Sequence, residues 1–505
     1  MATNTREAKN VILFVGDGMG VSTVTAARIR HGQLAGRPGE ETRLHLERFP
    51  HVALIKTYTV DHQVPDSAAT ATAFLCGVKA NFGTVGLDPR AHRGDCSSGK
   101  GRNLTCIVEL AQKAGKSTGF ITTARVTHAT PGPLYASAAD RDWETDSSLS
   151  KAAIRHGCTD IASQLLRPVG RDIDVILGGG RGRLMPTYKR DPEHTSLRGL
   201  RQDGRDLIKE WISSKHAAGK SARYVWNDHE FSRIQPSSVD SLMGLFEFSH
   251  MQYDSERHLD KAGEPSLLEM VEKAILILQK NKNGFFLMIE GARIDHAHHG
   301  NTARRALEET LAMDAAVERA LELVDTDDTL VIVTADHSHP LSIGSYATRG
   351  NPILGLTDWS NEHNGNNVSD VDNLPYTTLV YGNGPGYVDA HPRRNIINVN
   401  TQSTTYRQAS AVPLRIVSHD GSDVAAYAVG PMSHLLHGVH EQHYIFHVMA
   451  HAACLLDSPG LSRRKSDPRC TLRPTSRHRS NSAQRTVGLR ALLLLTAVLW
   501  WCGFN

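Results

Sequence analysis

The chain has 505 residues, of which 40% are hydrophobic and 22% are charged. This composition is typical of a soluble globular protein and excludes disordered, collagenous and polytopic membrane classes. The net charge of +3 is the sum of two unlike parts, because residues 461–505 carry +8 and residues 1–460 carry −5. The acidic body gives no indication of a nucleic-acid partner. Histidine is abundant, with 27 residues, which justifies a search for metal sites.

Short apolar runs recur along the chain and predict buried strands of a largely parallel sheet. These runs are Val11–Val15, Gly119–Thr123, Val175–Leu177, Gly284–Ile289, Leu330–Thr334 and Thr377–Tyr381. Helical spacing of apolar residues fills Pro265–Lys280 and Thr302–Val324. Strands that alternate with helices predict an α/β fold with a doubly wound, largely parallel central sheet flanked by helices, whose ligands bind at the carboxyl ends of strands.

A change of composition divides the chain into regions. Residues 345–417 are rich in Asn, Gly, Asp, Thr and Pro and predict an inserted surface subdomain, after which Asp423–Val429 returns to the sheet. We therefore expect one catalytic domain formed by residues 1–344 and 418–460. A basic stalk at 461–480 and a C-terminal segment at 481–505 follow it.

The two ends of the chain point in different directions. The apolar run Ala491–Trp501 is too short to span a bilayer comfortably, and small residues at Ser480–Ala483 and a polar spacer precede it. This order is the pattern of a GPI-attachment signal that is removed on transfer, although a membrane-touching C-terminus is an alternative. We expect an anchored protein on the extracellular face of the cell membrane. Because Met1–Asn10 contains no apolar signal region, we also expect the N-terminal sequence to be incomplete.

Asp17 lies in the glycine-rich turn Gly16–Gly20, directly after the first predicted strand. The turn lacks the third glycine of a dinucleotide fingerprint and the Lys-Ser/Thr of a phosphate-binding loop. A carboxylate at the carboxyl end of a strand is instead well placed for a divalent metal. A plain tight turn is the alternative.

The segment Glu290–His299 concentrates metal-binding groups. Asp295 and His299 are four residues apart, so on a helix they share one face and can hold one zinc ion. Glu290, at the strand end, suits an ion that prefers oxygen ligands. Asp336 and His337 place a second carboxylate and imidazole at another strand end. The pattern predicts a site with more than one metal.

Ser67 offers a nucleophile at the predicted start of a helix, among small side chains that leave room for a substrate. A simple helix cap is the alternative. A zinc ion nearby would activate the hydroxyl by lowering its pKa. Arg141 lies between Asp140 and Asp142, which predicts a guanidinium held by two carboxylates and able to bind phosphate with two hydrogen bonds. An ordinary surface salt bridge is the alternative.

Six motifs in this order resemble those of the alkaline phosphatases, specifically the animal, GPI-anchored branch, over residues 9–456. The motifs are Val15–Gly20, Pro65–Ala68, Thr127–Thr130, Glu290–His299, Thr334–His339 and Leu435–Glu441. The resemblance implies hydrolysis of phosphate monoesters at alkaline pH, through a phosphoserine at a site with two Zn²⁺ and one Mg²⁺. It also implies that residues 345–417 form a crown-like subdomain.

The resemblance assigns roles residue by residue. One zinc ion would be held by Asp295, His299 and His419, and the second by Asp17, Ser67, Asp336 and His337. The magnesium ion would be held by Asp17, Thr130 and Glu290, with His128 and His296 around it. Ser67 and Arg141 would be the catalytic residues. One Ca²⁺ would be held by Glu193, the Phe246 carbonyl, Glu247 and Glu264, where Glu264 departs from the aspartate usual in the family.

Other features of the family carry over less completely. The resemblance implies disulfides Cys96–Cys158 and Cys454–Cys470. Asn103 and Asn367 begin glycosylation motifs that would be used if the chain is secreted. The family's N-terminal helix, which embraces the partner subunit, is missing, so we expect a homodimer with a weakened contact. A phosphodiesterase or sulfatase of the same superfamily and an inactive surface binding protein are the alternative functions.

Overall fold

The computed structural model describes residues 3–358 and 367–457 and contains two sheets. The larger sheet has ten strands in the order β13-β2-β12-β8-β1-β7-β3-β4-β6-β5, and the smaller has the order β11-β10-β9. The strand bounds are β1 Asn10–Gly16, β2 His51–Lys56, β3 Ser117–Arg125, β4 Val175–Gly179, β5 Ala222–Val225, β6 Ser241–Leu245, β7 Phe285–Gly291, β8 Thr329–Ala335, β9 Leu341–Ile343, β10 Leu379–Gly384, β11 Ser410–Pro413, β12 Val424–Val429 and β13 Gly438–Glu441. The predicted basic stalk, the GPI signal and Cys470 lie outside the described residues.

The large sheet is parallel except at one strand. From β8 through β1, β7, β3, β4 and β6 to β5, every neighbouring pair is parallel. β12 is antiparallel to both β8 and β2, and β13 is parallel to β2. The prediction of a largely parallel central sheet is therefore confirmed.

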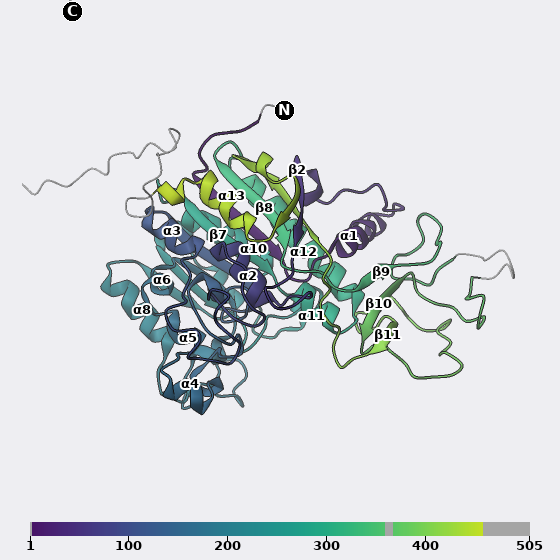
Figure 1. The fold of residues 1–505 in the computed structure, drawn as a ribbon, viewed down its shortest axis with the longest axis horizontal. Helices are drawn as coiled ribbons and strands as arrows, with labels where there is room; N and C mark the ends of the chain where they lie inside the picture. The colour runs from purple at the N-terminus through teal and green to yellow at the C-terminus, as the bar shows by residue number, and fades with distance from the viewer. Residues whose placement is uncertain (1–2, 359–366, 458–505) are drawn as a thin grey trace, which may run out of the picture.

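Helices cover this sheet in two groups (Figure 1). The helices α1 and α10 both pack against α12, and α2, α3 and α13 form a second group. The helix bounds are α1 Val21–Leu34, α2 Ser67–Cys76, α3 Ile107–Lys113, α4 Lys151–Arg155, α5 Ile161–Gln164, α6 Pro168–Asp172, α7 Arg181–Leu184, α8 Leu207–Ala217, α9 Asp228–Ser232, α10 Leu267–Leu278, α11 Arg293–His299, α12 Ala303–Leu323 and α13 Tyr444–Ala452.

The central strands form because their sequences are apolar on both faces. Every residue of β1, β7 and β8 is buried, as expected for parallel strands covered by helices on both sides. The predicted helix at Pro265–Lys280 is α10, where Ser266 and Glu269 form a capping box at its start.

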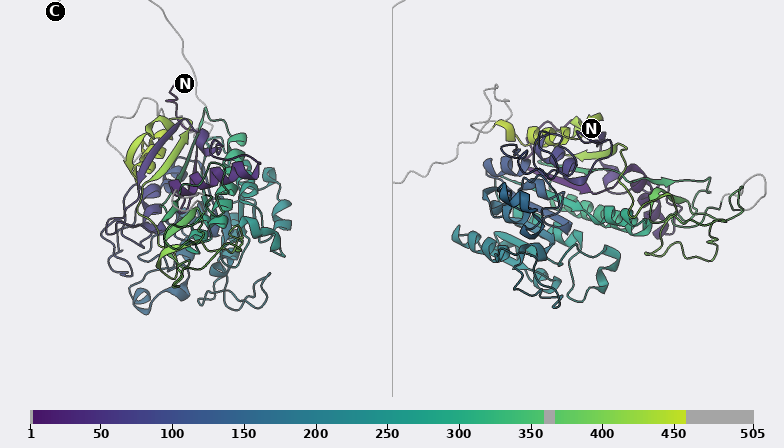
Figure 2. Two further views of the ribbon diagram at one scale, coloured as in Figure 1. Left: turned by 90° about the vertical axis from the view of Figure 1, so that its right-hand side faces the viewer. Right: turned by 60° about the horizontal axis from the view of Figure 1, so that its bottom comes forward.

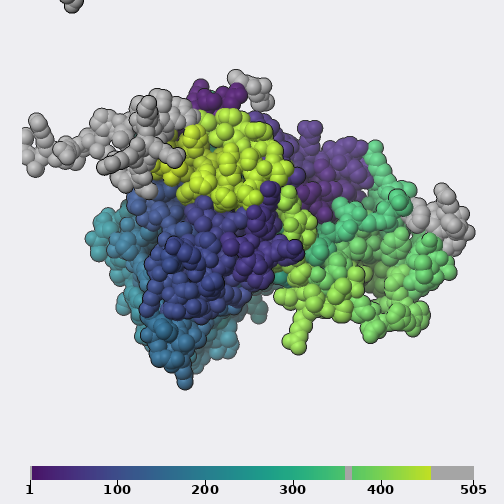
Figure 3. Space-filling view, in the orientation of Figure 1, coloured from purple at the N-terminus to yellow at the C-terminus, as the bar shows by residue number. Residues whose placement is uncertain are grey.

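The smaller sheet lies apart from the large one, at the right of Figure 1 and of the space-filling view in Figure 3. Its strands β10 and β11 come from residues 345–417. Its third strand, β9, lies just before this range in the sequence. The prediction that Thr377–Tyr381 joins the large sheet is wrong, because this run belongs to β10 of the small sheet. A short apolar run indicates a strand but does not identify its partners. The right-hand view of Figure 2 shows the same region extending from the body of the molecule when seen from another side.

Four strands of the large sheet are absent from the sequence predictions. They are β2, β5, β6 and β13. In β2, buried and solvent-facing residues alternate, so its sequence is not a continuous apolar run. β5 and β13 have four residues each, which gives little pattern to detect.

Two disulfides connect the described part of the chain. Cys96 and Cys158 are bonded, which confirms that pairing. Cys76 and Cys106 form a second bond that the sequence did not predict. The glycosylation predictions remain untested, although both asparagines are exposed. Over residues 3–358 and 367–457, the helices are all too short or too polar to cross a membrane.

Candidate active site

The site is built where the carboxyl ends of adjacent strands meet. β1 lies between β8 and β7, with Val15 opposite both Thr334 and Glu290. Asp17 and Asp336 directly follow β1 and β8, so both carboxylates reach the edge that Glu290 occupies. Gly18, at a φ of 68°, turns the chain here, and a Cβ at this position would lie 2.6 Å from His339 Cδ2. Glycine at position 18 therefore allows the turn to pack closely against His339.

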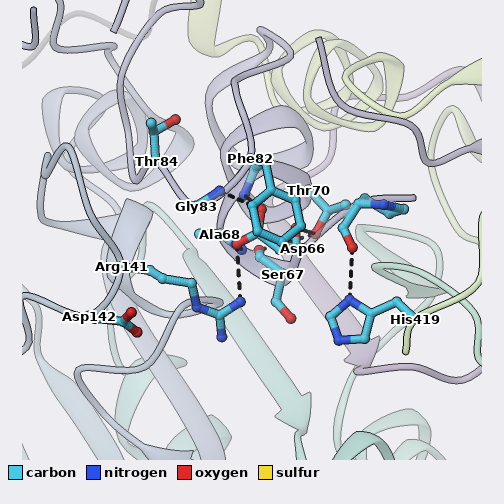
Figure 4. A network of polar contacts seen from close by, with 12 residues as sticks. Asp66, Ser67, Ala68, Thr70, Phe82, Gly83, Thr84, Arg141, Asp142 and His419 are labelled. Atoms are coloured by element: carbon cyan, nitrogen blue, oxygen red, sulfur yellow. Dashed lines mark hydrogen bonds and ion pairs between the residues drawn. The ribbon is translucent and has the colours of Figure 1, made fainter. Parts of the chain in front are cut away.

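Ser67 begins α2 and lies beside the ends of β1 and β8. Its hydroxyl oxygen is 3.5 Å from Asp17 Oδ2 and 3.3 Å from His337 Nε2. The helix cap is Asp66, whose carboxylate accepts hydrogen bonds from the backbone N–H groups of Ala68 and Ala69. Ser67 therefore does not cap the helix, and its hydroxyl is left for the site (Figure 4).

Arg141 is held differently from the prediction. Its NH1 donates to Asp66 Oδ2 at 3.1 Å, and Figure 4 shows the guanidinium beside Ser67. The sequence neighbours Asp140 and Asp142 instead accept hydrogen bonds from Arg93. The expectation that these two aspartates grip Arg141 is wrong, because the turn directs their side chains to another arginine.

Asp295 is the centre of the first metal-binding group. Its carboxylate lies 3.2 Å from His299 Nε2 and 3.5 Å from His419 Nε2. His419 reaches this edge because β12, which follows it, is antiparallel to β8. Burial alone would raise the pKa of Asp295, but the facing imidazoles of His299 and His339 hold it well below its usual range.

Hydrogen bonds at Nδ1 orient His299 and His419 so that each Nε2 can bind a metal. His299 Nδ1 donates to the Val417 carbonyl at 2.6 Å, and His419 Nδ1 donates to the Pro65 carbonyl at 2.8 Å. Each Nε2 then presents a lone pair, which is the usual arrangement of a metal-ligating histidine. His339 Nε2 lies 2.5 Å from Asp295 and was not predicted as part of the site. Its place in the motif Thr334–His339 was the only available signal.

The second group joins Asp17, Ser67, Asp336 and His337. His337 Nε2 lies 3.5 Å from Asp17 and 3.3 Å from Asp336, and all three side chains are fully buried. Burial raises the pKa of Asp336 to about 6, and burial together with Asp336 raises that of Asp17 well above its usual range. Buried carboxylates this close to one another require a cation to remain ionised at neutral pH. The donors therefore fit a zinc ion.

The third group has only oxygen atoms to offer. Glu290 Oε2 accepts a hydrogen bond from the Thr122 hydroxyl at 2.5 Å, and the Thr130 hydroxyl lies beside Glu290. Asp17 Oδ1, Glu290 Oε1 and Thr130 Oγ1 are buried without a hydrogen-bond partner in the described part of the chain. Burial raises the pKa of Glu290 to about 7. Three unpartnered oxygens fit magnesium, which prefers such ligands.

A separate acidic group contains glutamates that were predicted to hold calcium, of which Glu193 also pairs with Arg181 at 2.6 Å. Glu247 Oε2 lies 3.2 Å from His194 Nε2, and Glu193 Oε2 lies 3.8 Å from the same nitrogen. Burial, reinforced by Glu247, raises the pKa of Glu264 to about 9, and its Oε2 has no hydrogen-bond partner among the residues described. Phe246 precedes Glu247 and follows β6. The substitution of aspartate by Glu264 therefore keeps a carboxylate in this group.

Two further histidines near the site had no role assigned from the sequence: His250 was missed, and His298 was only counted among the metal-capable groups of Glu290–His299. His250, in the loop after β6, lies against His128 and His296, with ring centroids 5.3 and 4.2 Å away. His298 is fully buried and bonds to Thr23 and to the Tyr381 hydroxyl, so it joins structural elements and faces no ligand. His298 lies within the motif Glu290–His299 and His250 in a loop without a motif, so the sequence could not reveal either role.

Ser67 and the first metal-binding group, Asp295, His299 and His419, open onto a cavity of about 750 Å³. Ser67, Arg141 and His419 line it together with residues 414–418, which follow β11. Arg141 is 18% exposed at its side chain, so it is accessible from the cavity. The arrangement can bind an anionic group beside a nucleophilic hydroxyl and several cation sites.

Comparison with known proteins gives a consistent result. The family model for alkaline phosphatase matches residues 8–455. The human tissue-nonspecific alkaline phosphatase is 52% identical over 456 residues, which cover 90% of this chain and 85% of the relative. The alkaline phosphatase of Gadus morhua is 50% identical over 459 residues, covering 90% and 93%.

Solved structures extend the match to three dimensions. The alkaline phosphatase of Thermus thermophilus superposes with a TM-score of 0.62 and 26% identity, covering 90% of this chain and 93% of the other. The enzyme of the Antarctic bacterium TAB5 gives 0.59 at 20% identity, covering 89% and 99%. At that identity the likeness shows the fold.

Proposed function

Because the chain belongs to the alkaline phosphatase family and is an enzyme that hydrolyses phosphate monoesters, we propose that Ser67 is its nucleophile and that a phosphoserine is the intermediate. The observation that carries this proposal is the position of the Ser67 hydroxyl. It lies between Asp17 and His337 and opens to the cavity that Arg141 lines. A hydroxyl so placed is a nucleophile beside an anion-binding cation.

Arg141 binds and orients the substrate. Its NH1 is fixed by Asp66, and the rest of the guanidinium is left to donate to phosphoryl oxygens. The N-terminus of α2 adds a partial positive charge at the same place, while its Ala68 and Ala69 N–H groups donate to Asp66. Both features stabilise a negative phosphoryl group in front of Ser67.

In the first step, Ser67 Oγ attacks phosphorus in line with the leaving oxygen. The new Oγ–P bond forms as the ester bond breaks, and the alcohol leaves with a proton. In the second step water attacks the phosphoserine, which releases inorganic phosphate and restores the hydroxyl. Positioning and charge stabilisation account for most of such a reaction.

Three ion sites fit the donors described above, and the acidic group beside His194 would supply a fourth. One Zn²⁺ would be held at Asp295, His299 and His419, and a second at Asp17, Asp336, His337 and Ser67. Mg²⁺ would be held at Asp17, Thr130 and Glu290, and Ca²⁺ at Glu193, Phe246, Glu247 and Glu264. When bound, the zinc ions supply Lewis acidity that lowers the pKa of hydroxyl groups and neutralises phosphoryl oxygens.

A rate comparison after metal removal tests the proposal. The purified chain is stripped with a chelator and reloaded with zinc and magnesium, and its metal content is measured beside its rates on para-nitrophenyl phosphate, a phosphodiester and a sulfate ester. We expect the monoester rate to be lost and regained with two zinc ions and to exceed the other two by several orders of magnitude. A faster diester or sulfate rate would favour the superfamily alternative, and a zinc-free inactive chain would favour a binding protein.

We also propose that the protein is a homodimer exported to the extracellular face of the membrane and held by a GPI anchor. The disulfides Cys96–Cys158 and Cys76–Cys106 support export, because such bonds persist in oxidising compartments. Release of surface activity by a phospholipase specific for GPI anchors tests the attachment, and sedimentation of the released protein tests the dimer. Activity confined to the cytosol would contradict the proposal.

A further inference from the structure

Three histidines from separate elements meet beside the site. His128 follows β3, His250 lies in the loop after β6, and His296 is on α11. One ring nitrogen of each lies within 4.8 Å of those of the other two. Nitrogens at this spacing can surround a single atom about 2.8 Å away, the length of an ordinary hydrogen bond. We call these residues the histidine cluster.

Two of these rings accept a hydrogen bond from an arginine side chain. Arg125 NH1 donates to His250 Nε2, and Arg293 NH1 donates to His296 Nδ1 at 3.1 Å. A guanidinium only donates hydrogen bonds, so the facing ring nitrogen must accept. A neutral imidazole has one hydrogen, which these contacts place on His250 Nδ1 and His296 Nε2.

His128 also has one ring nitrogen that faces a guanidinium and must therefore accept a hydrogen bond. Arg141 NH2 lies 3.4 Å from His128 Nε2, so the hydrogen of His128 is on Nδ1. A histidine that binds a metal instead donates its far N–H to an acceptor, as His299 and His419 do toward carbonyl oxygens. Each ring of the histidine cluster therefore keeps one N–H donor, whereas a metal would need lone pairs.

Cationic side chains gather around His250 and His296, whereas His128 also lies within 4.8 Å of carboxylate oxygens of Asp17 and Glu290. Arg125 and Arg183 share one carboxylate, Glu144, at 2.6 and 3.7 Å. Arg293 has no carboxylate within ion-pair distance in the described ranges, and its guanidinium stacks on Tyr253. On the side of His250 and His296, this local excess of cations favours an anion over a divalent metal.

Within residues 3–358 and 367–457, four buried donor atoms around the cluster are left without a partner, beside the unpartnered Asp17 and Glu290 oxygens that lie next to His128. The donors are His128 Nδ1, His250 Nδ1, Arg183 Nε and Arg293 Nε, each lacking a hydrogen-bond partner among the residues that the structure describes. Buried polar groups are nearly always hydrogen-bonded, so this set needs an acceptor from outside the chain. An oxyanion supplies several acceptor oxygens and the missing negative charge.

We propose that the histidine cluster is a second anion site, which takes a phosphate-sized oxyanion beside Ser67. His128 and His296 line the same cavity as Ser67, so the site can be reached by a ligand in that cavity. The oxyanion is either the distal anionic group of a substrate or free inorganic phosphate. The proposal stands apart from the proposed function, since the donors hold an anion whether or not Ser67 reacts.

The stoichiometry of phosphate binding tests this site. The metal-loaded Ser67→Ala chain, which cannot form the phosphoserine, is titrated with inorganic phosphate by equilibrium dialysis. We expect two phosphate ions per chain, and one after His250→Leu is added. His250→Gln, which keeps an N–H donor, restores the second ion with about tenfold weaker affinity. His437→Leu, at an exposed histidine elsewhere, keeps two. One phosphate ion per chain before any change at His250 overturns the proposal, whichever variants fold.

Two further readouts separate the sources and the competing ligand. Two substrates are compared in the chain with Ser67 intact, phenyl phosphate and its para-carboxy derivative. If the site takes a distal group, His250→Leu raises the Michaelis constant of the carboxylated substrate about tenfold and leaves that of phenyl phosphate unchanged. If both constants stay unchanged while the second phosphate is lost, the ligand is free phosphate. If His250→Leu removes one equivalent of zinc, the site holds a metal and the proposal is wrong.

Discussion

The strongest structural link between the nucleophile and the phosphate-binding arginine is Asp66. Its carboxylate accepts hydrogen bonds from the backbone N–H groups of Ala68, Ala69 and Gly83 at 3.2, 3.4 and 2.8 Å. It also accepts from Arg141 NH1 at 3.1 Å. One side chain therefore caps the helix that carries Ser67 and orients the arginine beside it. Replacing it with alanine should weaken both functions together.

The size of the effect follows from these contacts. Loss of the helix cap costs about 1 kcal/mol, and a buried Gly83 N–H left without a partner costs about 2 kcal/mol. Arg141 loses its carboxylate but is partly solvated, which adds about 1 kcal/mol. Asp66→Ala should thus lower the free energy of unfolding by about 4 kcal/mol. Asp66→Asn, which keeps one acceptor oxygen, should lose about half as much.

Denaturant unfolding and phosphate inhibition measure the two functions. We expect the inhibition constant of inorganic phosphate to rise about tenfold in Asp66→Ala, because Arg141 must then be ordered by the ligand. Asp172→Ala is the matched control, since that aspartate is 56% exposed and pairs with Arg171, outside the lining of the cavity. The reasoning is refuted if Asp66→Ala is no less stable than the control or binds phosphate equally well.

Three other predictions follow from the structure. The double variant Cys76→Ser with Cys106→Ser should lose about 4 kcal/mol of unfolding free energy, because the bond joins residues 30 apart; denaturant titration showing a loss under about 1 kcal/mol would contradict this. Burial raises the pKa of Glu309 to about 8, so the folded chain binds a proton that the unfolded chain releases above its usual pKa of 4.5. Stability is therefore lost as pH rises from about 4.5 to about 8, and Glu309→Gln should gain more melting temperature over the parent at pH 9 than at pH 5; equal gains would exclude this origin. Glu264→Gln should weaken calcium stabilisation about tenfold in a thermal-shift titration at fixed zinc and magnesium, and an unchanged calcium midpoint would remove Glu264 from the site.

The central sheet and the site's local motifs could be predicted because their signals are local in sequence. The runs that form β1, β7 and β8 are continuous and fully buried, and polar residues follow each directly. In a parallel sheet, such ends must lie side by side. That rule alone brings Asp17, Glu290 and Asp336 to one edge.

Contacts between distant segments could not be predicted in the same way. Asp66 and Arg141 are 75 residues apart, and the nearer aspartates in sequence were the natural but wrong choice. His250 belongs to a loop with no motif, and only the fold brings it to His128. The pairing of Cys76 with Cys106 was equally hidden, because spacing does not decide between several cysteine partners.

The most direct test of the account is to trap the covalent intermediate. The metal-loaded enzyme is mixed with a phosphate monoester, quenched in acid and digested, and its peptides are analysed by mass spectrometry. The account predicts a phosphoryl group on Ser67, and none on that peptide in Ser67→Ala, which should also lose nearly all turnover. Full turnover in Ser67→Ala, or a phosphoryl group trapped on another residue, would contradict it.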